Sequence, residues 1–313
     1  MVFGYTVGTG GAKVTKSVRA ASPRPLLKTG GSIGTDQTTI HKQAMSPPHG
    51  PKPQVPATFP GPLQVIAAGL PRCATSTLKE VFEDHLAIGP CMHMNRCLPH
   101  PATMKLVHDA LREPDTPKRR AILYTLFDGY AATADFPGHL FIEDLIDMYP
   151  DAKVVLNVRK GGATDWEASM KTTIAPFMSW QYRVACWWSV PDWWHYQTEM
   201  AWEDDVKKRF GVDHFWDAAA YDAHNDWVKR LCQERGRDVL VWEPGMGWDG
   251  LCEFVDRKEP TVPLPRNNDR AKMEKVVQWR IALGLRLWAK RAGLTIALSV
   301  VGSWGLGRML SIV

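Results

Sequence analysis

The sequence predicts an α/β fold in which helices flank a central, mainly parallel sheet. Strand-like apolar runs alternate with helix-like segments, which is typical of a sheet whose strands are connected by helices. One run, residues 153–159, is rich in β-branched residues, as in strands buried on both faces. Hydrophobic residues make up 45% of the 313 positions and charged residues 23%, a composition that excludes a wholly disordered or fibrous chain.

The expected elements begin at residue 63. Residues 63–69 predict a short apolar strand, and a turn over residues 70–77 follows it. Residues 78–86 then predict a helix, because their apolar positions share one helical face. These positions are Leu78, Val81, Phe82 and Leu86.

Three further strands are expected, over residues 130–135, 153–159 and 239–242. The helix after the first of these opens at Pro137, because proline is favoured in the first turn of a helix. Its apolar stripe consists of Leu140, Phe141, Leu145 and Met148.

The composition divides the chain into three parts. Residues 1–62 hold nine of the 23 prolines and no apolar run, which predicts a disordered, basic arm. Residues 63–275 form the expected folded domain, and residues 276–313 predict a helix that is first basic and then apolar. The overall charge of +5 is too small to indicate a nucleic-acid partner.

The six cysteines show no paired spacing, which indicates buried thiols in a reducing compartment and favours the cytoplasm. A zinc site at Cys91, His93 and Cys97 lacks the usual ligand spacing.

The C-terminal segment, residues 294–313, contains a single charged residue, Arg308, and has the length of a bilayer span. Arg286, Lys290 and Arg291 form a basic flank before it. Two alternatives remain: a membrane anchor that spans or lies at the interface, and a helix packed on a soluble protein.

Residues 177–228 are rich in tryptophan. Their side chains predict either packing between helices or an aromatic lid over an apolar acceptor. They are Trp180, Trp187, Trp188, Trp193, Trp194, Trp202, Trp216 and Trp227.

The turn after the first strand carries the clearest chemistry. A strand that feeds a tight turn into a helix presents free backbone N–H groups to an anion. Arg72 adds positive charge, and hydroxyl side chains occupy the entrance of the helix. The turn lacks the spacing of a Walker A loop and of a dinucleotide-binding loop. An anion site and an ordinary helix start both remain possible.

The segment G-L-P-R-C-A-T-S-T-L-K, residues 69–79, resembles the 5′-phosphosulfate loop of PAPS-dependent sulfotransferases. The resemblance is to a divergent branch common in fungi and bacteria, with the pattern G-L-P-R-T-G-T-x-S-L-K. It covers about residues 63–275 and implies a P-loop-like fold. Further matches follow in order at residues 90–94, 129–137, 149–159, 247–252 and 265–269.

The resemblance implies roles for named residues. The 5′-phosphosulfate would be held by Arg72, Ala74, Thr75, Ser76 and Thr77, and the 3′-phosphate by Arg159 and Ser169. Relatives place a catalytic base in an H-x-P element, and the corresponding element here begins with Asp135. The implied catalytic residues are therefore Asp135 and Arg72.

Each assignment has an alternative. Asp135 would otherwise cap the helix at Pro137, Arg159 would form a structural ion pair, and Ser169 would be exposed. Other candidate bases are His93, His100 and Glu143. We expect Asp144, His214 and His224 to lie at the surface, as Glu143 would if it is no base.

The resemblance implies transfer of a sulfuryl group from PAPS to a hydroxyl of an apolar or aromatic small molecule, with PAP as product and no metal. Cys73 and Ala74 replace the usual Thr-Gly of the loop, and the segment after Arg159 is two residues longer than in relatives. These departures prompt an alternative, a catalytically inactive, membrane-tethered binding protein. A nucleotide hydrolase or kinase is disfavoured, because no P-loop lysine or Walker B carboxylate is evident.

Overall fold

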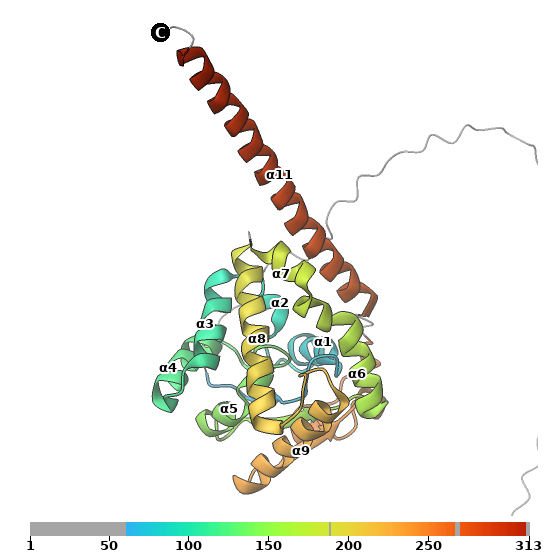
Figure 1. Cartoon of the computed structure of the whole chain (residues 1–313). Helices are drawn as coiled ribbons and strands as arrows, with labels where there is room; N and C mark the ends of the chain where they lie inside the picture. The colour runs from blue at the N-terminus through green and yellow to red at the C-terminus, as the bar shows by residue number, and fades with distance from the viewer. Residues whose placement is uncertain (1–60, 188, 267–269, 311–313) are drawn as a thin grey trace, which may run out of the picture. The chain divides into compact units, whose positions relative to one another are not determined.

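The structure, a computed structural model, describes residues 61–187, 189–266 and 270–310. The arm expected over residues 1–62 lies outside the described residues, apart from Gly61 and Pro62. In the described part of the chain, five parallel strands form one sheet in the order β2-β3-β1-β4-β5. The predicted α/β fold with helices around a parallel sheet is confirmed (Figure 1).

The strands are short. They are β1 (Val65–Ala67), β2 (Cys91–Met92), β3 (Ala132–Thr133), β4 (Lys153–Asn157) and β5 (Val239–Trp242). β1 is central and pairs with β3 on one side and β4 on the other. Because all strands are parallel, their carboxyl ends meet at one edge, which is where ligands bind in open α/β sheets. The loops after β1, β3 and β4 therefore converge there.

Helices and helical turns connect and cover the strands. The first group is α1 (Thr75–Glu80), the π-helical turn η1 (Val81–His85), α2 (Met94–Cys97), α3 (Pro101–Arg112), α4 (Thr116–Phe127), η2 (Gly138–Leu140), α5 (Ile142–Met148) and α6 (Gly162–Thr173). The second is η3 (Ala175–Met178), α7 (Trp180–Cys186), α8 (Val190–Phe210), α9 (Ala218–Glu234), η4 (Pro244–Met246), α10 (Leu251–Phe254) and α11 (Arg270–Leu310).

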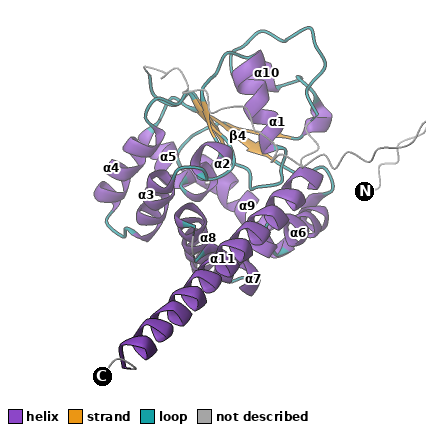
Figure 2. Ribbon diagram, turned by 90° about the horizontal axis from the view of Figure 1, so that it is seen from above, coloured by secondary structure: helices purple, strands orange, loops and turns teal. Residues whose placement is uncertain are grey.

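The core lies on both faces of the sheet, as the alternation of side chains along β4 shows. Val155 joins the apolar cluster formed with α1, η1 and α10. Val154 and Leu156 join the larger cluster on the other face, to which α3, α5, α8 and α9 contribute. Figure 2 shows the sheet between these helices. β4 is thus buried on both faces, as its composition predicts.

Several boundaries differ from the sequence prediction. The helix expected to open at Pro137 begins at Ile142, after the short turn η2, because Phe141 leaves helical geometry with φ −124° and ψ 28°. The strands expected over residues 63–69 and 130–135 are shorter in the structure, with three and two residues respectively. β2 was not predicted, because two residues carry no periodicity.

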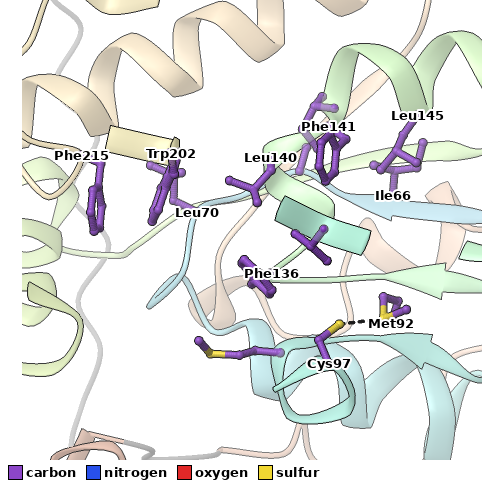
Figure 3. Close-up of a cluster of buried hydrophobic side chains, with 14 of the residues drawn as sticks. Ile66, Leu70, Met92, Cys97, Phe136, Leu140, Phe141, Leu145, Trp202 and Phe215 are labelled. Carbon is purple, nitrogen blue, oxygen red and sulfur yellow. Dashed lines mark hydrogen bonds between the residues drawn. The ribbon is translucent and has the colours of Figure 1, made fainter. Parts of the chain in front are cut away.

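The tryptophans of residues 177–228 differ in burial, and Trp188 among them lies outside the described residues. Trp202 stacks on Phe215 at a ring distance of 4.1 Å, and Figure 3 shows both beside Leu70. Trp180 and Trp187 are 70% and 62% exposed. Packing between helices is therefore right for Trp202, whereas Trp180 and Trp187 do not pack into the core. All six cysteines are free and buried, as predicted.

α11 packs on α7 and α6 over its first half. Its residues 289–301 are all exposed. No helix in the described residues combines the length and apolar character needed to cross a membrane. The spanning form of the expected anchor is therefore not supported there.

Candidate active site

Asn157, the last residue of β4, holds both ends of the loop after β1. The backbone N–H of Gly69 donates to Asn157 Oδ1 at 2.9 Å, and Asn157 Nδ2 donates to the carbonyl of Cys73 at 2.8 Å. A Cβ on Gly69 would lie 2.0 Å from the carbonyl oxygen of Asn157, so only glycine fits there. The sequence prediction missed Asn157, although a polar residue inside an apolar strand was a visible signal.

Two residues of this loop adopt left-handed backbone geometry. Arg72 has φ 70° and Ala74 has φ 57°. Residues other than glycine rarely adopt this geometry, and it concentrates at functional sites where the surroundings enforce it. Trp166 of α6 contributes to this enforcement, because its indole Nε1–H donates to the carbonyl of Pro71 at 2.8 Å.

The loop meets the two residues predicted to bind the 3′-phosphate. Arg72 Nε donates to Ser169 Oγ at 3.3 Å, and an Nη of Arg159 donates to the carbonyl of Arg72 at 2.9 Å. Ser169 is 1% exposed, so the surface alternative for it is wrong. The backbone N–H of Arg159 donates to the Tyr221 hydroxyl at 3.0 Å. Arg72, Arg159 and Ser169 therefore form one cluster.

The three hydroxyl residues occupy the first turn of α1. Thr75 and Thr77 are buried, and Ser76 is partly exposed. The N–H groups of a first helical turn have no partner within the helix and point to an anion. The neighbouring Cys73 thiol is buried, which raises its pKa and keeps it neutral. Cys73 is thus unsuited to act as a nucleophile.

Asp135 lies at the end of β3, facing α1. Burial raises the pKa of Asp135, while His93, Arg72, the backbone N–H of Phe136 and the Thr75 hydroxyl oppose that shift. The N-cap of α5 is Phe141. The alternative that Asp135 caps this helix is therefore wrong.

His93 stands beside Asp135, with 3.5 Å between His93 Nε2 and Asp135 Oδ2. Nδ1 of His93 accepts the backbone N–H of Asn95 at 3.3 Å. A neutral imidazole that accepts at Nδ1 carries its proton on Nε2. The Nε2–H therefore faces the Asp135 carboxylate, and His93 is placed to support an ionised Asp135 rather than to replace it.

The remaining candidate bases lie elsewhere. Glu143 pairs with Arg235 at 3.0 Å on the outside of α5, and His100 is exposed. Asp144 is buried against Arg119 and Arg120, contrary to the prediction that it faces solvent.

His214 has a half-exposed side chain that pairs with Glu203 at 2.8 Å, in keeping with the surface prediction. His224 is buried, so its predicted surface position is wrong; its Nε2–H donates to the carbonyl of Ala68 at 2.8 Å.

A pocket lies beside Leu70, between α8 and α9. Aromatic and apolar side chains, Trp202 among them, line it together with His139, His224, Asp205 and Arg209. Burial lowers the pKa of His139 to about 3 and that of His224 to about 4, so both are neutral at pH 7. The sequence prediction missed His139.

Comparison with known proteins decides the family. A family model described as "Sulfotransferase domain" matches residues 64–273. The chain belongs to the sulfotransferase domain family. This match confirms the resemblance derived from the loop and the motifs after it.

The chain is also similar to a protein from Aspergillus versicolor called "Ava biosynthesis cluster protein M". The two are 26% identical over 260 residues, which cover 77% of this chain and 96% of the relative. This relative's name states no activity.

The described residues contain no group of three or more His, Cys, Asp or Glu side chains arranged to hold a metal ion. Cys97 Sγ instead contacts the Met92 sulfur at 3.3 Å, as Figure 3 shows. Cys91 and Cys97 are thus parts of the apolar core.

Proposed function

We propose that the protein transfers the sulfuryl group of PAPS to a hydroxyl of an apolar or aromatic small molecule. The observation that carries this proposal is that four residues converge on the loop after β1, at the carboxyl edge of the sheet. The Arg72 side chain contacts Ser169, the Arg159 side chain contacts the Arg72 carbonyl, and Asp135 faces the same loop through Thr75. A cationic cradle and a buried carboxylate thus adjoin each other.

The residues present fit the nucleotide. Nε of Arg159 is buried and makes no hydrogen bond within the protein. A phosphate oxygen would accept the hydrogen bond that this Nε–H can donate. Arg72 and the hydroxyls of Ser76 and Thr77 surround the start of α1, where the helix dipole favours negative charge. We assign the 5′ end to Arg72, Ala74 and Thr75–Thr77, and the 3′-phosphate to Arg159 and Ser169. Bound PAPS supplies the activated sulfuryl group.

Asp135 is the base in this proposal. Its carboxylate accepts the proton of the acceptor hydroxyl, and the Nε2–H of His93 stabilises the charge that Asp135 must carry beforehand. Positioning and positive charge from Arg72 supply most of the acceleration, by analogy with phosphoryl transfer. General-base catalysis adds about 10²–10⁴-fold.

The acceptor class rests on the aromatic surroundings of the loop. The pocket beside Leu70 combines aromatic walls with two neutral histidines, and its two charged lining residues, Asp205 and Arg209, pair with each other at 3.3 Å. An uncharged acceptor is proposed from this side-chain character alone. Leu70 belongs both to the phosphate loop and to the lining of this pocket, which links the two parts of the proposed site.

One observation favours the second candidate, an inactive binding protein. The methyl group of Ala74 stands in left-handed backbone geometry where the related loops carry glycine, and glycine permits closer approach of a ligand. Such a protein would bind the nucleotide without turnover.

Incubation with [³⁵S]PAPS and a panel of phenolic, sterol and polyketide alcohols tests the proposal. We expect label in at least one alcohol with the wild type and about 10²-fold less with Asp135→Asn. Binding of PAP with no labelled product across the panel would favour the inactive alternative.

A further inference from the structure

The C-terminal half of α11 is an apolar helix without a covering surface. Residues 292–307 contain no charged side chain. Within the part whose side chains are described, every residue from 292 to 301 is exposed. The large apolar side chains Leu294, Ile296, Leu298, Val300 and Val301 are between 60% and 69% exposed. Contiguous apolar surface of this kind marks an interaction site.

The first half of α11, by contrast, is firmly attached. Arg280 forms an ion pair with Asp192 of α8, and Trp288 Nε1–H donates to the carbonyl of Val184 at 2.7 Å. Gly284 permits close approach to α7, because a Cβ there would lie 2.4 Å from Cβ of Ala185. The apolar half therefore begins directly after a fixed point, and Figure 1 shows it extending beyond the other helices.

Aromatic side chains surround that point. Trp187 lies 6.4 Å from Trp288 and 6.5 Å from Trp193, measured between ring centroids. Trp187 is 62% and Trp193 37% exposed. Tryptophan is enriched where proteins meet the boundary between a bilayer and water.

Basic residues lie on α11 at the start of the apolar half. Arg286, Lys290 and Arg291 are exposed, and residues 275–313 contain no acidic side chain. Clustered basic residues beside an apolar segment attract anionic lipid headgroups. A protein groove would cover one face of a helix, whereas the exposed residues here lie on every face.

We propose that residues 286–301 of α11 dock on an anionic lipid surface, with the Trp187–Trp193–Trp288 cluster and the basic residues at headgroup level. The uncharged run of 16 residues is shorter than the roughly 20 needed to span a bilayer, so the helix enters from one side only. This proposal does not depend on the proposed enzymatic function.

Co-sedimentation of the full chain with vesicles tests it. One set contains phosphatidylcholine alone. The other also contains about 30% phosphatidylserine, which supplies anionic headgroups. We expect sedimentation with the anionic vesicles that is at least about tenfold stronger and that declines with added salt.

Three variants sharpen the test. The double variant Leu294→Asp, Leu298→Asp places charge on the apolar half and should lose vesicle binding. Its control, Met246→Asp with Val262→Asp, changes two apolar residues that are 40% and 44% exposed elsewhere, and should bind like the wild type. The variant Arg286→Glu, Lys290→Glu keeps the apolar half and should lose the preference for anionic vesicles.

The outcomes separate the possibilities. Equal binding to both vesicle sets, or undiminished binding of the Leu294→Asp, Leu298→Asp variant, would overturn the proposal. A chain that forms dimers in light scattering without lipid, and binds no vesicles, would show that a second copy covers this helix instead. The readout is lipid binding, so it stands whether or not sulfuryl transfer is found.

Discussion

The imidazole of His93 directs its Nε2–H toward the carboxylate of Asp135 across 3.5 Å, and both side chains are buried. This pair sets the protonation of the proposed base. Burial favours a neutral Asp135, whereas His93 and Arg72 favour the ionised form. The Nε2–H of His93 and the charge of Arg72 therefore keep a desolvated carboxylate available as a base.

Replacing Asp135 with asparagine is expected to lower kcat by about 10²-fold or more, because the amide cannot accept a proton. Affinity for PAP should stay nearly unchanged, since Asp135 is not among the residues assigned to the nucleotide. Steady-state kinetics and calorimetry on the same preparation measure both quantities. Glu143→Gln, on the outside of α5, is the matched control and should keep full activity. Full activity of Asp135→Asn would remove Asp135 from the mechanism.

The rate should also depend on pH. Because burial raises the pKa of Asp135, kcat should fall with decreasing pH at values above the ordinary aspartate range near 3.9.

The raised pKa of Asp135 should also affect the stability of the fold. A carboxyl group whose pKa is higher in the folded than in the unfolded state makes its full contribution to stability at pH values below the unfolded pKa. This contribution is lost as the pH rises through the folded pKa. At pH 7 the Asp135→Asn variant should therefore unfold at the wild-type melting temperature or above it. A lower melting temperature would show that the ionised carboxylate is structural.

Asn157→Ala should destabilise the fold. It leaves the Gly69 N–H and the Cys73 carbonyl without their partner inside the protein, at a cost of about 1–3 kcal/mol for each buried group. Urea unfolding measures the loss, and PAP affinity should fall in parallel because the loop opens. A variant with normal stability and normal affinity would show that Asn157 does not hold the loop.

Ala74 permits a test of the loop geometry. Ala74→Gly should stabilise the protein by up to about 1 kcal/mol, because glycine adopts positive φ without steric cost. Ala74→Val should destabilise it, because β-branched residues are the least suited to this region. Denaturant midpoints of the two variants should thus move in opposite directions. Movement in the same direction would contradict the left-handed geometry of Ala74.

The sequence predicted much of this arrangement because its signals are local. The apolar run of β4 and the hydroxyls at the start of α1 are short-range patterns, and the motif order indicated the family. Asp135, Arg72 and Arg159 were named from the resemblance to that family, and the structure places them at one edge of the sheet.

Other features depend on distant partners. Asn157 matters because it meets Gly69, 88 positions away, and no local pattern reports that contact. His224 and Asp144 were expected at the surface, since polar residues usually lie there. Each is buried through a partner far along the chain: the Ala68 carbonyl for His224, and Arg119 for Asp144.

Binding of PAP is the sharpest test of the proposed nucleotide site. Calorimetry and thermal unfolding with PAP, ATP and NAD should show binding of PAP alone, and PAP at 100 times its Kd should stabilise the protein by about 2.7 kcal/mol. Arg159→Ala should weaken this binding, whereas Arg230→Ala, an exposed arginine on α9, should leave it unchanged. Binding of NAD in place of PAP, or no binding of PAP at all, would contradict the account.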